Sequence, residues 1–138
     1  MPLDAMTGWT PAADVCPSRW GDPNAEARPR LIPTLTDKQV LASILRWMRG
    51  DWWLRGKIHD GKGGHCLMGW LLVYTEPTTN VRQFTPQSVR IMQLLYDQLP
   101  KSAQRSRTAM HLSLGRYNDS HTEGTVRGLV RRAYEAAC

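Results

Sequence analysis

The sequence predicts an all-α protein, a compact bundle of four to five helices with an extended N-terminal arm. Two observations predict this class. Apolar residues recur at every third or fourth position along several stretches, and residues of the helix-capping type precede these stretches. The chain has 138 residues and is 41% hydrophobic, enough for one hydrophobic core. We therefore expect a proline-rich arm over residues 1–33 and a helical domain over residues 34–138.

The arm contains six of the nine prolines and no periodic apolar pattern. Because proline fixes φ and removes a backbone donor, an extended or irregular course is expected here instead of a helix. Trp9, Trp20, Leu31 and Ile32 could hold the arm against the domain. A free tail is the alternative, since terminal segments are often poorly ordered.

The first helix is expected to begin after Thr36, which forms a capping box with Gln39, and to stop near Gly50. Residues 51–54 favour a short turn. The glycine-rich stretch 55–64 favours an exposed loop or a short hairpin, so a hairpin near 52–64 is one possibility. The apolar run 66–74 predicts a buried central helix in which Gly69 lets another backbone approach closely. A buried strand is its alternative.

Three further helices are expected in the second half of the chain. Thr85 and Pro86 have the form of an N-cap followed by proline at the first helical position. A short helix is expected over 108–117, and a last helix from a capping box over 120–123, with Asn118 and Asp119 forming the turn between them. The apolar residues expected to be buried in the first two of these helices are Val89, Met92, Leu95, Tyr96, Leu99, Met110, Leu112 and Leu114.

The charge is unevenly distributed. The net charge is +6, and the residues after Pro100 carry seven bases against three acids. Such a basic region could meet phosphates, an acidic protein or only water. The three cysteines are widely spaced, the N-terminus lacks the pattern of a signal peptide, and no apolar run approaches a membrane span. A soluble, cytoplasmic protein without membrane association is therefore expected.

Cys66 is the residue with the clearest catalytic alternative. It would lie at a helix start, where the helix dipole favours a thiolate, and His111 and Asn118 follow it in the order found in papain-like enzymes. The interpretation we prefer is a small buried residue that opens an apolar helix. Histidines, Cys66 and nearby aspartates could also ligate a metal, but their spacing fits no metal motif, so no metal is expected.

Two surface features, a glycine-rich stretch and a group of arginines, each have a functional and a structural interpretation. The stretch 55–64 offers glycine amides with Lys57 and Lys62, yet it lacks the order of a nucleotide-binding loop, so an ordinary solvated turn is favoured. Arg127 and Arg131 lie four residues apart on the last helix, next to Arg132 and near Arg116. Such a stripe could bind a phosphate backbone or an acidic partner, and a solvated face is its alternative.

From about residue 35 onward, the chain resembles a family of small proteins of unknown function, found largely in actinobacteria and their phages. The motifs that carry the resemblance are Trp52-Trp53, His65-Cys66-Leu67-Met68-Gly69, Tyr117-Asn118-Asp119, and Thr125-Val126 leading to Ala133. The chain departs from the family in having Trp70 where a small residue is usual, and in its proline-rich arm. The resemblance implies a helical fold and a phage or bacterial origin, and it implies no reaction.

The leading expectation is a non-enzymatic phage or bacterial accessory protein, without cofactor, that binds a macromolecular partner. A host or phage protein is slightly favoured over nucleic acid, because the charge is modest and six tryptophans suit an interface with aromatic and arginine anchors. The alternative is a hydrolase or acyltransferase that uses Cys66 with His111 and Asn118. The residues expected to contact the partner are Arg116, Arg127, Arg131, Arg132 and Trp52.

Overall fold

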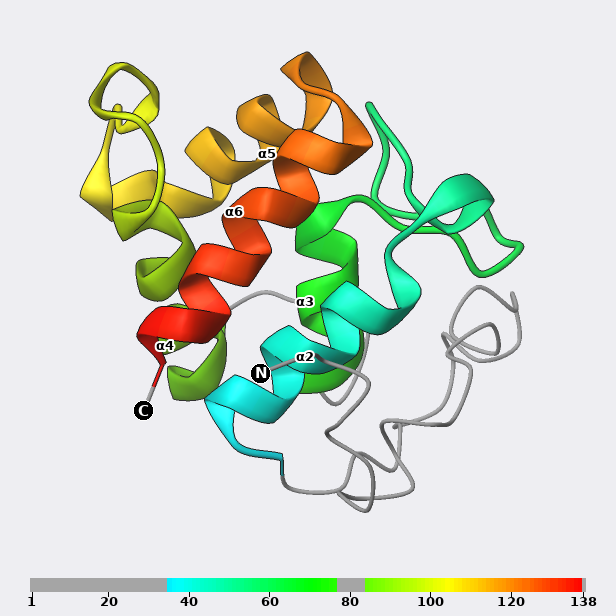
Figure 1. Ribbon diagram of the computed structural model, residues 1–138, viewed down its shortest axis with the longest axis horizontal. Helices are drawn as coiled ribbons and strands as arrows, with labels where there is room; N and C mark the ends of the chain where they lie inside the picture. The colour runs from blue at the N-terminus through cyan, green and yellow to red at the C-terminus, as the bar shows by residue number, and fades with distance from the viewer. Residues whose placement is uncertain (1–34, 77–83, 138) are drawn as a thin grey trace.

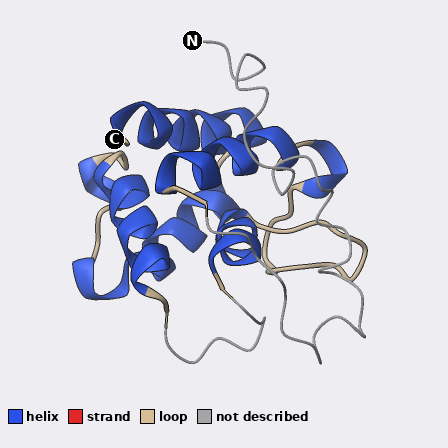
Figure 2. Ribbon diagram, turned by 90° about the horizontal axis from the view of Figure 1, so that it is seen from below, coloured by secondary structure: helices blue, strands red, loops and turns tan. Residues whose placement is uncertain are grey.

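The computed structural model describes residues 35–76 and 84–137, so the predicted arm over 1–33 lies outside the described residues. The described part is all-α, as predicted (Figures 1 and 2). Its α-helices are α2 (Asp37–Trp47), α3 (Leu67–Thr75), α4 (Pro86–Asp97), α5 (Met110–Ser120) and α6 (Glu123–Ala136). Its short 3₁₀ helices are η4 (Gly50–Trp52), η5 (Lys101–Ala103) and η6 (Arg107–Ala109).

Helix α3 is the centre of the core. Every residue from Leu67 to Thr75 is buried, and Trp70 is fully excluded from solvent. Helices α2, α4 and α5 all pack against it, and α6 lies against α2 and α4 (Figure 1). The prediction of a buried central helix is therefore confirmed, and its alternative, a buried strand, is wrong.

The caps at the starts of α2 and α4 are also confirmed. Thr36 Oγ1 accepts a hydrogen bond from Gln39 N at 3.1 Å, and Gln39 Oε1 accepts one from Thr36 N at 2.9 Å. Thr85 caps α4 through its side chain alone, which accepts a hydrogen bond from Ser88 N at 3.2 Å, and Pro86 is at the first position of the helix. These local hydrogen bonds satisfy helix amides that have no partner within the helix.

The boundary between α5 and α6 differs from the prediction. Helix α5 continues through Asn118 and Asp119 to Ser120, so these two residues do not form a turn. Thr122 is the N-cap of α6 and accepts a hydrogen bond from Thr125 N at 3.3 Å, so the capping box expected over 120–123 is wrong by two residues. Ser120 is instead the last residue of α5, where its hydroxyl donates to the Arg116 carbonyl at 2.7 Å.

Two apolar residues expected in the core are exposed. Val89 is 43% exposed and Leu112 is 56% exposed. On α4 the buried face includes Ser88 in place of Val89, because the Ser88 hydroxyl donates to Thr75 Oγ1 at 2.7 Å inside the core. On α5 the buried positions follow helical spacing from Met110, and Leu112 lies off that stripe.

The segment between η4 and α3 forms a loop held by isolated bridges. His65 pairs with Trp53 and with His59. The described residues contain no named strand, so the hairpin considered near 52–64 does not form. In the same part of the chain, no helix is long and apolar enough to cross a membrane.

Candidate functional site: an arginine–tryptophan surface

Exposed arginines and half-buried tryptophans meet where α2 ends against α6. Helix α2 ends at Trp47, and the chain turns through Gly50, whose φ of 57° is a conformation that favours glycine. This turn brings the ring of Trp52 to 6.2 Å from that of Trp47, and the guanidinium of Arg46 lies 5.6 Å from the Trp47 ring. We call Arg46, Trp47, Arg49, Trp52 and Arg131 the α2–α6 surface.

Trp52 is held in place from inside. Its ring lies 6.3 Å from that of Trp70, and Trp70 Nε1 donates to the Trp52 carbonyl at 2.7 Å. The predicted contact residue Trp52 is therefore half-buried, with one part in the core and the rest beside Trp47. A tryptophan anchored in this way needs little ordering on binding, which lowers the entropic cost of an interface.

Arg127 does not lie on the outer face with Arg131. It is half-buried against α2, where its Nη1 donates to the carbonyls of Leu45 at 2.6 Å and Met48 at 2.8 Å. Burial lowers the pKa of its guanidinium, and the nearby charges of Arg49 and Arg131 lower it further, against the opposing effect of Glu123. Arg127 thus satisfies two carbonyls at the end of α2.

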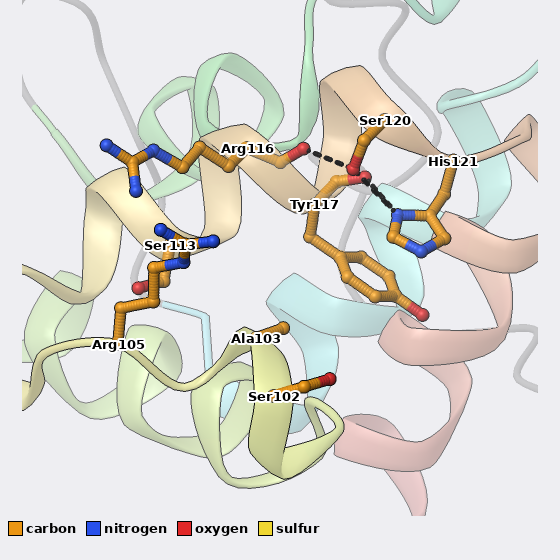
Figure 3. A pocket seen from close by; sticks show the side chains of 8 residues that line it. All are labelled: Ser102, Ala103, Arg105, Ser113, Arg116, Tyr117, Ser120 and His121. Carbon is orange, nitrogen blue, oxygen red and sulfur yellow. Dashed lines mark hydrogen bonds between the residues drawn. The ribbon is translucent and has the colours of Figure 1, made fainter.

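Arg116 and Arg132 lie apart from the α2–α6 surface. Arg116 is on α5 and, with Arg105, lines a hollow beside η5 (Figure 3). Arg132 is exposed about 100° around α6 from Arg131, and its Nη1 lies 3.6 Å from where a Cβ on Gly128 would be. The structure therefore distributes the predicted arginines over separate places and does not bring them into one stripe.

The thiol of Cys66 lies in the core. Its residue is 7% exposed, its Sγ accepts a hydrogen bond from Gly69 N at 3.4 Å, and Cys66 is the N-cap of α3. Burial raises the thiol pKa, and this outweighs the opposing hydrogen bonds from the Gly69 and Met68 amides. The lowered thiol pKa on which the catalytic alternative depends is therefore not found, and Cys66 is a small buried residue at the start of an apolar helix, as we preferred.

The three residues of the catalytic alternative do not form a triad. Asn118 lies beside the start of α3, since its Oδ1 accepts a hydrogen bond from Leu67 N at 3.1 Å. His111 is seven residues earlier on α5, about 10 Å along the helix axis. Its ring lies 5.4 Å from that of Phe84. The structure thus brings Asn118 near Cys66 and leaves His111 at the other end of α5.

Asn118 has a structural role that the sequence did not reveal. It is fully buried, and its Oδ1 also accepts a hydrogen bond from Trp53 Nε1 at 2.7 Å, while its Nδ2 donates to Leu54 O at 2.9 Å. Its neighbour Asp119 accepts a hydrogen bond from Gly56 N at 2.8 Å. Together they fasten the 53–66 loop to α5.

Two backbone amides of the 55–64 stretch already donate hydrogen bonds to a side chain of the same stretch. Asp60 Oδ1 accepts hydrogen bonds from Lys62 N at 2.8 Å and Gly64 N at 3.0 Å. Burial acts to raise the pKa of Asp60, but these amides outweigh it and the pKa is lowered. A phosphate would have to displace this carboxylate. Within 35–76 and 84–137, no group of three or more His, Cys, Asp or Glu side chains could hold a metal ion.

No family model, curated protein or solved structure matches this chain. The resemblance to the actinobacterial and phage family therefore stays a prediction.

Proposed function

We propose that the protein is a non-enzymatic phage or bacterial accessory protein that binds an acidic macromolecular partner through the α2–α6 surface. The observation that carries the proposal is that some arginines are paired with carboxylates within the fold and others are not. Within 35–76 and 84–137, the ion pairs join Arg90 to Asp37 and Arg107 to Asp97, each at 3.0 Å. Arg49 and Arg131 are exposed and have no carboxylate partner in that part of the chain.

Several acidic side chains accept hydrogen bonds from backbone amides of this chain. Glu123 Oε1 accepts a hydrogen bond from Gly50 N at 2.8 Å, and Asp119 and Glu76 accept hydrogen bonds from the amides of Gly56 and Thr85. These carboxylates are hydrogen-bonded to backbone amides, whereas Arg49 and Arg131 are exposed to solvent. A partner that presents carboxylates would offset the charge of these arginines.

A protein partner is favoured over nucleic acid because tryptophans accompany the arginines. Tryptophan and arginine are enriched among the few residues that dominate protein–protein binding energies. The half-buried rings of Trp47 and Trp52 lie side by side within the α2–α6 surface, with Arg46 over the Trp47 ring. Binding to a nucleic-acid backbone depends mainly on the number of phosphates neutralised and does not need this aromatic pair.

The alternative enzymatic function receives no support from the site geometry. A thiol in the core, with a raised pKa, is a poor nucleophile at neutral pH. His111 lies too far along α5 to serve as its base.

Affinity capture from an actinobacterial lysate tests the proposal. The Arg49→Glu/Arg131→Glu variant should lose the captured partner, and raising the salt concentration should weaken capture by the unmodified protein. Arg127 is left unchanged because it stabilises the end of α2. A labelled DNA duplex, tested in parallel by fluorescence anisotropy, should bind weakly.

The matched control is Lys57→Glu/Lys62→Glu, which changes the net charge by the same amount at two exposed positions outside the surface. It should retain the partner. Full capture by the arginine variant, or equal loss in both variants, would contradict a specific role for the surface. DNA binding that is tight and lost only in the arginine variant would make nucleic acid the partner.

A further inference from the structure

A hollow of about 160 Å³ lies between η5 and α5, outside the α2–α6 surface. Figure 3 shows the side chains that line it, with the guanidinium groups of Arg105 and Arg116 on the side of Ser113 and the Tyr117 and His121 rings at the other end. The lining residues are Ser102, Ala103, Arg105, Ser113, Arg116, Tyr117, Ser120 and His121. None of these eight described residues is acidic.

The two arginines give the hollow its charge. Both are exposed, and neither has a carboxylate partner within 35–76 and 84–137. An anion bound in the hollow would offset part of this positive charge. A guanidinium offers several N–H donors in a fixed plane, an arrangement that matches the oxygens of a phosphate.

Ser113 adds a hydroxyl donor to the lining of the hollow. The residue is only 4% exposed and lines the hollow, yet its hydroxyl has no hydrogen-bond partner among the described residues. The hydroxyls of Ser43 and Ser120 instead donate to the carbonyl four residues earlier, at 2.8 and 2.7 Å. A hydroxyl that lines the hollow without an internal acceptor is available to donate to a ligand oxygen.

The opposite end of the hollow is closed by an ordered aromatic pair. The rings of Tyr117 and His121 are stacked with their centroids 3.9 Å apart, and His121 Nδ1 is held 2.9 Å from the Tyr117 carbonyl (Figure 3). Since Tyr117 is 5% exposed, its face is not free to stack on a ligand ring. The hollow therefore suits one compact oxyanion and offers no stacking platform for a base.

From this arrangement we infer that the hollow between η5 and α5 is a binding site for a single phosphate group, held by Arg105, Arg116 and Ser113. The phosphate is a free ion or the monoester group of a small molecule or side chain. The inference is independent of the proposed function, because none of the lining residues belongs to the α2–α6 surface.

Titration with inorganic phosphate, followed by two-dimensional ¹H–¹⁵N NMR of the full chain at pH 7.5 and fixed ionic strength, tests this site. Phosphate should shift the Nε–Hε signals of Arg105 and Arg116 and the amides of Ser102 and Ser113, whereas chloride should not. Arg105→Gln and Arg116→Gln should each weaken binding about tenfold, as expected for loss of charge-assisted hydrogen bonds. Ser113→Ala should weaken it by a smaller factor.

The control is Lys101→Gln, which removes a positive charge from η5, beside the hollow, at a position that does not line it. It should bind phosphate nearly as well as the unmodified protein. The spectra of all variants also report whether each is folded. Absent shifts, shifts equally produced by chloride, or equal weakening in Lys101→Gln would overturn the inference.

Two further ligands show whether the bound phosphate is a free ion, a monoester group or part of a nucleic-acid backbone. O-phosphoserine should bind at least as tightly as inorganic phosphate if the site accepts a monoester, and less tightly if it accepts only the free ion. A single-stranded oligothymidylate should bind no better than phosphate. Tighter oligonucleotide binding that Arg116→Gln abolishes would replace the inference by contact with a nucleic-acid backbone.

Discussion

Individual polar side chains hold the elements of this fold together at their ends. Arg127 satisfies the last carbonyls of α2 from the neighbouring helix, and Asn118 joins α5 to the 53–66 loop and to the start of α3. Each makes several hydrogen bonds that link segments distant in the sequence. Such residues are costly to lose, because their partners are left without hydrogen bonds in partly or fully buried places.

Replacing Arg127 by alanine should destabilise the protein by about 2 kcal/mol, since hydrogen bonds to a charged donor contribute about 1.5–3 kcal/mol. Urea unfolding followed by circular dichroism measures the change. Arg131→Ala is the matched control on the same helix and should stay within about 0.5 kcal/mol, as expected at an exposed position. Equal stability of the two variants would mean that Arg127 does not cap α2.

For single residues, the sequence shows which side chains can form hydrogen bonds or ion pairs, but it does not show which partners they meet in the fold. The four-residue spacing of Arg127 and Arg131 places them near one face of α6, but it cannot say which flank meets α2. Asn118 and Asp119 resemble a turn in the sequence, because both residues favour turns, and their partners around Trp53 and Gly56 are about 60 residues away. Only the tertiary contacts distinguish these roles.

At the scale of elements, the sequence predicted helices well wherever caps and apolar spacing agreed. The starts of α2 and α4 are right because Thr36 and Thr85 act within a single turn. The start of α6 was misplaced because Ser120 and Thr122 are both plausible caps, and the choice depends on where α5 ends. The prediction that Val89 and Leu112 are buried is wrong, because the 3.6-residue period of a helix leaves some apolar residues outside the stripe that faces the core.

The expectation that Gly69 permits a close backbone approach is confirmed. A Cβ at this position would lie 2.4 Å from the Ile58 carbonyl oxygen, which belongs to the loop that crosses α3. In the same loop, Cys66 N donates to Ile58 O at 3.2 Å. The start of α3 and the loop are thus packed so closely that no side chain fits between them.

Gly69→Ala should therefore destabilise the protein by about 1–3 kcal/mol, as overpacking does, although alanine favours helices. Gly115→Ala on α5, where a Cβ would meet nothing within 4 Å, should instead stabilise it by up to about 1 kcal/mol. Thermal unfolding of the two variants compares them directly. A gain in stability from Gly69→Ala would show that the loop can move away from α3.

At the scale of the whole molecule, a buried apolar interior is enclosed by a surface that carries most of the charged side chains. The all-α class and the central position of α3 were predictable from composition and periodicity. The arrangement of surface arginines was not, because it depends on how α6 lies against α2. The thiol of Cys66, the most reactive side-chain type in the described residues, belongs to the interior. The proposed binding function therefore involves exterior residues.

The labelling rate of the Cys66 thiol tests this separation most directly. In a Cys16→Ser/Cys138→Ser variant, iodoacetamide should react with Cys66 far more slowly in the native protein than in urea. Because the folded state raises the thiol pKa, the unfolded state releases the proton first as pH rises. The free energy of unfolding should therefore be fully retained below about pH 8.5 and fall above it, and Cys66→Ala should remove that fall. Native labelling at pH 7 as fast as in urea would contradict the account and favour the thiol as a nucleophile.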